Sequence, residues 1–143
     1  MNPQFTAMPE KFHLGYPAVD LQHEILFVLF DELTQSIKNI GNNQKDDSFE
    51  LKEIYMGLNS YVKNHFNYEE EKMHASKYQN SEAHTHEHRQ LEQQITDLSN
   101  QFTMAADKEE INIIAKNTHA FLYEWLVQHI ADSDKKLCDY LIQ

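Results

Sequence analysis

Apolar side chains recur at steps of three and four residues in four long segments of the chain. Such steps keep side chains on one face of an α-helix, so each segment predicts an amphipathic helix. The predicted helices span residues 20–40, 48–74, 82–104 and 108–140, with a break in the last one near Ala131. The four stripes consist of His23, Leu26, Phe30, Leu33, Ile37 and Ile40; Leu51, Tyr55, Leu58, Val62, His65 and Glu69; His84, His88, Leu91, Ile95, Leu98 and Phe102; and Ile111, Ala115, Thr118, Leu122, Trp125 and His129.

Capping residues mark the ends of these segments. Side-chain oxygens of Asp, Asn, Ser and Thr accept hydrogen bonds from the free N–H groups of a first helical turn. The predicted N-caps are Asp20, Asp47, Ser81 and Asp107. Glu50 and Glu110 follow two of these caps at the spacing of a capping box. Gly41 is predicted to end the first helix.

The region before the helices contains all three prolines. Residues 1–18 are therefore predicted to form an extended arm with turns. The apolar residues expected to pack this arm along the body are Phe5, Phe12, Leu14 and Tyr16. Short connections between four amphipathic helices favour neighbours that run antiparallel. We therefore predict a single all-α domain over residues 1–143, an up-down-up-down antiparallel four-helix bundle with an N-terminal arm.

Polar residues able to bind metals occupy the apolar stripe at one end of each helix. They are His23 at the start of the first helix, His65 and Glu69 late in the second, His84 and His88 at the start of the third, and His129 late in the fourth. In an up-down-up-down bundle these four helix ends meet at one end of the molecule. Buried histidines and a carboxylate without partners would be costly. The pattern therefore predicts a metal site in the core.

The other histidines have an ordinary structural interpretation. His86 lies about 200° round the helix from His84, at about 100° per residue. His74 is near a helix end, His119 follows a stripe residue, and His13 lies in the arm. In the run of three glutamates only Glu69 is on the stripe, so its two neighbours are assigned to the solvated face.

Composition and charge narrow the range of partners. The formal net charge of -11 argues against nucleic acid as the main partner. The one cysteine, Cys138, cannot form an internal disulfide, which favours a reducing compartment. No apolar run has the length of a membrane span, and the N-terminus lacks the layout of a signal peptide. We therefore expect a cytoplasmic protein.

The motifs at the predicted site resemble those of the hemerythrin family, in particular single-domain bacterial hemerythrins. The matching stretches are Val19-Asp20-Leu21-Gln22-His23, His65-Phe66-x-x-Glu69-Glu70-x-x-Met73, His84-x-x-x-His88 and His129-Ile130-x-x-x-Asp134. The resemblance covers the chain from about Phe12 to Leu137. Many members have a tryptophan in the arm where this chain has Phe12.

This resemblance implies a di-iron centre with an oxo or hydroxo bridge. One iron would be bound by His84, His88 and His129, the other by His23 and His65, and both by Glu69 and Asp134. Asp134 lies five residues after His129, about 140° further round an ideal helix. On geometry alone Asp132 is an alternative, and the choice of Asp134 comes from the family motif.

The resemblance also implies reversible O2 binding at the iron that has fewer ligands, next to His23 and His65. The expected wall of the O2 pocket consists of Leu26, Phe66, Trp125, Leu126 and Ile130. A binding protein rather than an enzyme is expected, for carriage, storage or delivery of oxygen. The alternatives are an O2 or redox sensor that acts through a partner protein, and a di-iron enzyme acting on peroxide or nitric oxide. A ferritin-like oxidase is disfavoured, because the Glu71–His74 pair lies off the stripe.

Overall fold

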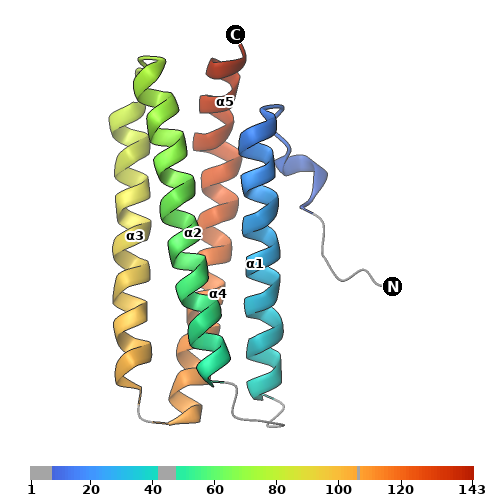
Figure 1. The fold of residues 1–143 in the computed structure, drawn as a ribbon, viewed down its shortest axis with the longest axis vertical. Coiled ribbons are helices and arrows are strands. Elements are labelled where there is room, and N and C mark those ends of the chain that lie inside the picture. The colour runs from blue at the N-terminus through green and yellow to red at the C-terminus, as the bar shows by residue number, and fades with distance from the viewer. Residues whose placement is uncertain (1–7, 42–47, 106) are drawn as a thin grey trace.

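Four long helices lie side by side in the computed structural model, which describes residues 8–41, 48–105 and 107–143 (Figure 1). They are α1 (Pro17–Gly41), α2 (Ser48–Ala75), α3 (Ser81–Met104) and α4 (Lys108–His129). α1 packs against α2 and α4, and α3 packs against the same two helices. The predicted all-α bundle is therefore confirmed. The start of α1, the end of α2 and the start of α3 lie at the same end of the molecule as the C-terminus.

The predicted stripes form the core between the helices. Leu51, Leu58 and Leu91 are completely or almost completely buried, as are most other stripe residues. Leu98 and Trp125 are only partly buried and pack at the edge of the same core. On α4 it is Leu126, next to Trp125, that is buried. Burial of each large aliphatic side chain contributes roughly 1.5–3 kcal/mol, so these stripes supply most of the driving force for association of the helices.

The last predicted helix, 108–140, consists of three elements. α4 is followed by a π-helical turn, η2 (Ile130–Asp134), and by α5 (Lys135–Ile142). The backbone N–H of Lys135 donates to the carbonyl of Ile130, five residues earlier. This turn holds one residue more than an α-helical turn and lies where the break near Ala131 was expected.

The predicted caps have mixed outcomes. Asp107 is confirmed, because its carboxylate accepts from the backbone N–H of Glu110 at 2.9 Å. Asp20 does not cap α1, which starts three residues earlier at Pro17, a favoured first helical residue. Ser81 is itself the first residue of α3, and Asn80 before it makes no side-chain cap. Asp47 lies outside the described residues.

The carboxylate of Asp20 instead holds the turn that precedes α1. It accepts from the backbone N–H of Leu14 at 2.7 Å and of Gly15 at 3.1 Å. Gly15 has a φ of +85°, a conformation that side chains rarely adopt.

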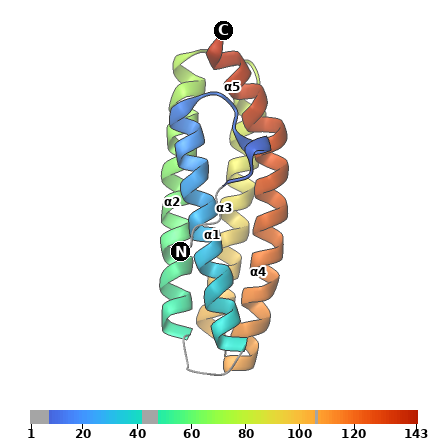
Figure 2. The same ribbon diagram turned by 90° about the vertical axis from the view of Figure 1, so that its right-hand side faces the viewer.

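The arm packs across the bundle from α1 towards the C-terminal elements (Figure 2). It contains a short 3-10 helix, η1 (Glu10–Phe12). Phe12 is buried and stacks on Phe27 of α1, with ring centroids 5.4 Å apart. Phe12 and Met8 form a second small core with Ile130 of η2. The predicted packing is thus found for Phe12, and Phe5 lies outside the described residues.

Within the described ranges, no helix is both long enough and apolar enough to cross a membrane.

Candidate metal centre

The predicted metal-binding side chains meet in the core at the end of the bundle that carries the C-terminus. α1 contributes His23, α2 contributes His65 and Glu69, and α3 contributes His84 and His88. His129 ends α4, and Asp134 ends η2. All seven side chains are buried, and none is more than 4% exposed. Their donor atoms form two groups that share Glu69 and Asp134.

The first group contains three histidines. The Nε2 atoms of His84 and His88 lie 3.2 and 3.1 Å from Oε1 of Glu69. The Nε2 atoms of His84 and His129 both lie 3.1 Å from Oδ1 of Asp134. Three imidazole nitrogens and two carboxylate oxygens therefore surround one point.

The second group uses the other oxygen of each carboxylate. Nε2 of His65 lies 3.1 Å from Oε2 of Glu69. Nε2 of His23 lies 3.0 Å from Oδ2 of Asp134 and 3.7 Å from Oε2 of Glu69. Glu69 and Asp134 thus each direct one oxygen to each histidine group. This is the arrangement that a carboxylate adopts when it bridges two cations.

Several of these close contacts are not hydrogen bonds. Nε2 of His23 and of His129, Oε2 of Glu69 and both carboxylate oxygens of Asp134 are buried without a hydrogen-bond partner. Two donor atoms that each lie about 2.1 Å from one metal ion, at right angles, are about 3 Å apart. Most of the distances between the donor atoms given above have this length. Unpartnered buried groups are costly, so a protein keeps them where they serve another purpose. Convergent donors, several of which make no hydrogen bond to one another, fit a metal site.

Three of the histidines are held from outside through Nδ1. Nδ1 of His65 lies 2.6 Å from Oε1 of Gln22, an amide on α1. For two other rings the acceptor is a carboxylate. Nδ1 of His88 lies 2.7 Å from Oε2 of Glu70.

Nδ1 of His129 lies 2.8 Å from Oε1 of Glu87, which also accepts from the hydroxyl of Ser133 at 2.7 Å. An acceptor at Nδ1 fixes the ring orientation and leaves Nε2 free to bind a metal. The two carboxylate supports both serve the three-histidine group, through His88 and His129.

In the absence of a cation, protons balance the charge of the two carboxylates. Burial alone lowers the pKa of His129, but Asp134 outweighs it and raises this pKa to about 10. The same balance raises the pKa of His23 and of His84 to about 9. Burial alone raises the pKa of Glu69, but the charge on His65 and the hydrogen bonds from neighbouring rings hold it well below its usual value. The donors therefore carry protons that an incoming cation must displace.

The π-helical turn explains how Asp134 reaches the site. In an ideal α-helix a residue five positions after His129 lies about 140° away from it. The additional residue in η2 lets Asp134 take the position that an i+4 residue would have, above His129. Asp132, the geometric alternative, is 69% exposed in its side chain and pairs with Lys136. It contributes no atom to either group.

The four remaining histidines lie outside both groups. His86 and His74 are exposed. His13 is exposed in the arm, 3.7 Å from a carboxylate of α1. His119 is half-buried, and its Nε2 lies 2.7 Å from the hydroxyl of Thr34.

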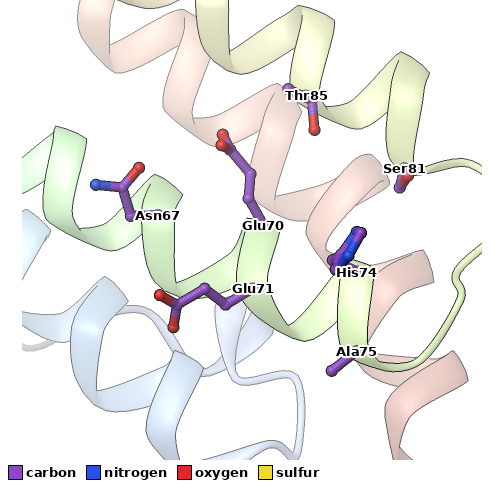
Figure 3. A pocket seen from close by; sticks show the side chains of 7 residues that line it. All are labelled: Asn67, Glu70, Glu71, His74, Ala75, Ser81 and Thr85. Carbon is purple, nitrogen blue, oxygen red and sulfur yellow. The ribbon is translucent and has the colours of Figure 1, made fainter.

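The Glu71–His74 pair lies beside an open hollow between α2 and α3 (Figure 3). Glu70 extends towards α3, whereas Glu71 points away from it. No residue around this hollow belongs to either metal-binding group. The pair therefore does not form part of the centre.

Aromatic rings cover the three-histidine group. Phe66 lies flat on His88, with ring centroids 3.7 Å apart and an angle of 5° between the planes. Trp125 stacks on His129 at 4.4 Å and 17°. These two predicted wall residues thus lie against the three-histidine group, and the ring centroid of Phe66 also lies 6.0 Å from that of His65 in the second group. Leu26 and Leu126 belong to the main core, and Ile130 belongs to the small core under the arm.

The outer supports Gln22, Glu70 and Glu87 were not predicted from the sequence. Glu70 was assigned to solvent, but its side chain is 19% exposed and contacts His88. Each of the three is adjacent in sequence to a ligand but supports a ligand on another helix. A polar residue directly before or after a predicted ligand was therefore the available signal.

Comparisons with known proteins agree with this geometry. Residues 14–141 match the family model described as the hemerythrin HHE cation binding domain. A crystal structure of wild-type hemerythrin has a TM-score of 0.77 and 25% identity, over 97% of this chain and 98% of that chain. The structure of a leucine-to-phenylalanine mutant has a TM-score of 0.77 and 24% identity, over 96% of this chain and 97% of the other. No curated protein matches the chain significantly.

Proposed function

Because this chain belongs to the hemerythrin family of cation-binding domains, we propose that it holds two iron ions and binds O2 reversibly. The ligands would be the seven side chains of the centre. The observation that carries the proposal concerns Glu69 and Asp134: each of these carboxylates places one oxygen in each histidine group. A carboxylate shared in this way serves two cations, and a single ion would leave one of the two groups of donors without a partner.

The donor set favours iron. It consists of imidazole nitrogens and carboxylate oxygens, with no thiolate. Structural zinc sites are usually closed and four-coordinate, whereas the first group alone offers five donors. Iron bound here would supply the electrons that hold O2 and would recover them when O2 leaves.

The two groups offer unequal numbers of donors. The first has three histidines and two carboxylate oxygens, and the second has two histidines and two carboxylate oxygens. A small ligand therefore finds room beside His23 and His65, as in other sites that bind through an unfilled position. His23 is completely buried, which restricts that ligand to a small molecule.

Apolar side chains surround the position proposed for this small ligand. Leu26 lies one helical turn from His23, and Leu126 lies one turn from His129, and both are buried. Ile130 is covered from outside by Met8 and Phe12 of the arm. Such surroundings exclude water and mobile protons, which favours release of O2 unchanged over its reduction. We therefore propose a binding protein rather than an enzyme, which carries, stores or delivers oxygen, in the last case to a partner protein.

Visible spectroscopy tests the proposal. The reduced, iron-loaded protein is exposed to O2 and then to vacuum through several cycles. Reversible binding predicts an absorption band that appears with O2 and disappears under vacuum without loss of amplitude. A spectrum that changes once with O2 and never returns would contradict reversible binding.

The apolar surroundings are tested by Leu126→Asn. This variant leaves every ligand in place but puts a polar group into the core beside the centre. We expect full iron content and decay of the oxygenated form that is accelerated more than threefold. A threefold change corresponds to about 0.65 kcal/mol of barrier. Leu122→Asn, one turn further from the centre, controls for a polar group in the same helix.

A further inference from the structure

Two hollows on the surface reach the three-histidine group. The larger, of about 610 Å³, lies beside Trp125 and has His129 in its wall. The smaller, of about 190 Å³, lies at the bundle end and has His84 in its wall. Both hollows are bordered by Glu87, Asp132 and Ser133. We call these three residues the shared rim.

The shared rim carries negative charge. The side chain of Asp132 is 69% exposed and that of Glu87 is 40% exposed. Oε1 of Glu87 lies 2.8 Å from Nδ1 of His129, so this carboxylate connects the rim to the three-histidine group. A positive charge faces the rim at Lys136, whose Nζ lies 3.2 Å from Oδ1 of Asp132. A rim of this kind raises the local concentration of cations.

Acidic side chains alone do not distinguish this place. The hollow of Figure 3 is also bordered by two carboxylates, Glu70 and Glu71, but no residue of the metal-binding groups lines it. The shared rim differs because the hollows beside it are lined by His129 and His84. These two residues are buried donors of one metal-binding group.

We propose that the shared rim is the entrance through which a divalent cation reaches the metal centre. The inference rests on the proposed metal centre and adds a path to it. Asp132 attracts the hydrated cation, and His129 and His84 are the first ligands that it meets. Glu87 lies between solvent and His129, and it stabilises the cation during this transfer.

Four charge changes on one helical segment test the entrance. Asp132→Asn removes rim charge, and Lys136→Gln removes the cation that competes for Asp132. The matched controls are Asp139→Asn and Lys135→Gln. Asp139 and Lys135 form an ion pair of the same spacing and the same 3.2 Å distance, and neither lines either hollow.

The rate of loading is measured with the full-length metal-free protein and Fe²⁺ alone, without oxygen. Trp125 is the single tryptophan of the chain and stacks on His129, so its fluorescence reports iron at that ligand. Stopped-flow mixing gives the rate, and elemental analysis gives the final iron content. Circular dichroism before mixing checks that all variants have equal helix content.

We expect Asp132→Asn to slow loading roughly threefold and Lys136→Gln to accelerate it by a similar factor. One charge acts on a divalent cation across several ångströms of water with about this effect, and added salt reduces it. The two controls should load at the wild-type rate, and all variants should reach the same final iron content.

Equal rates in all five proteins, with full iron content, would overturn the entrance and leave the metal centre intact. Protein that takes up no iron at all would instead overturn the proposed function. If the metal-free protein lacks helix, the rate at which bound iron exchanges with isotopically labelled Fe²⁺ replaces the loading rate. The same order of variants is then expected, and equal exchange rates would again overturn the entrance.

Discussion

Removal of the carboxylate behind His129 should weaken metal binding without removing a ligand. The perturbation is Glu87→Gln, compared with Glu87→Ala. Glu87 accepts from Nδ1 of His129 at 2.8 Å and from the hydroxyl of Ser133 at 2.7 Å. Glutamine keeps an acceptor oxygen but not the charge, whereas alanine removes both.

The structure sets the size of the effect. A hydrogen bond to a charged group contributes about 1.5–3 kcal/mol, and a neutral one about 1 kcal/mol. Solvent screens Glu87, whose side chain is 40% exposed, so the lower value of the charged range applies. The change to glutamine should therefore cost between about 0.5 and 1 kcal/mol, which is a two- to fivefold loss of affinity. The alanine variant also loses ring orientation and should bind iron about 10–100-fold more weakly.

The assay is a titration of Fe²⁺ against a competing chelator without oxygen. Glu71→Gln is the matched control, because it removes a charge at the same bundle end beside the hollow of Figure 3. We expect the control to bind as the wild type does. Wild-type affinity in both Glu87 variants would refute the argument that this carboxylate supports the centre.

Three further changes test other parts of the account. Gly57→Ala should raise the free energy of unfolding, measured in urea, by about 1 kcal/mol, because Gly57 lies inside α2 and an added Cβ meets no atom within 4 Å. No gain in stability would mean that the glycine has a role not visible in its surroundings. His84→Ala should lose iron, whereas His86→Ala, on the exposed face of α3, should keep it, and the reverse result would show that α3 is rotated. Raising the pH from 6.5 towards 10 should destabilise the metal-free protein in urea. The reason is that Asp134 overcomes the effect of burial and raises the pKa of His129 in the folded protein to about 10. The stabilisation from the protonated ring is present below pH 6.5 and is lost as the pH passes the folded-state pKa. Constant stability from pH 6.5 to 10 would contradict the raised pKa of His129 in the folded protein.

Helical periodicity was sufficient to predict the bundle and most of the site. Leu58, Val62 and Glu69 lie on one stripe of α2, and all are buried. The period of 3.6 residues determines which residues share a face, and the short loops determine which helix ends meet. Buried polar residues at one level of four stripes therefore predicted the centre before any distance was known.

Features that depend on backbone detail or on neighbouring helices were harder to predict. Five residues between His129 and Asp134 do not fit an ideal helix, and only the π-helical turn reconciles them. Gln22, Glu70 and Glu87 lie beside the stripes, so periodicity placed them outside the core. Their partners are on adjacent helices, and the contact depends on how two helices are rotated against each other. That rotation is a property of the packed structure.

The number of iron atoms per chain tests the central claim most directly. In fully loaded protein, elemental analysis referred to the protein concentration should give two, because Glu69 and Asp134 each direct one oxygen to each of two histidine groups. A ratio of one under saturating Fe²⁺ would contradict the paired centre and the function proposed from it.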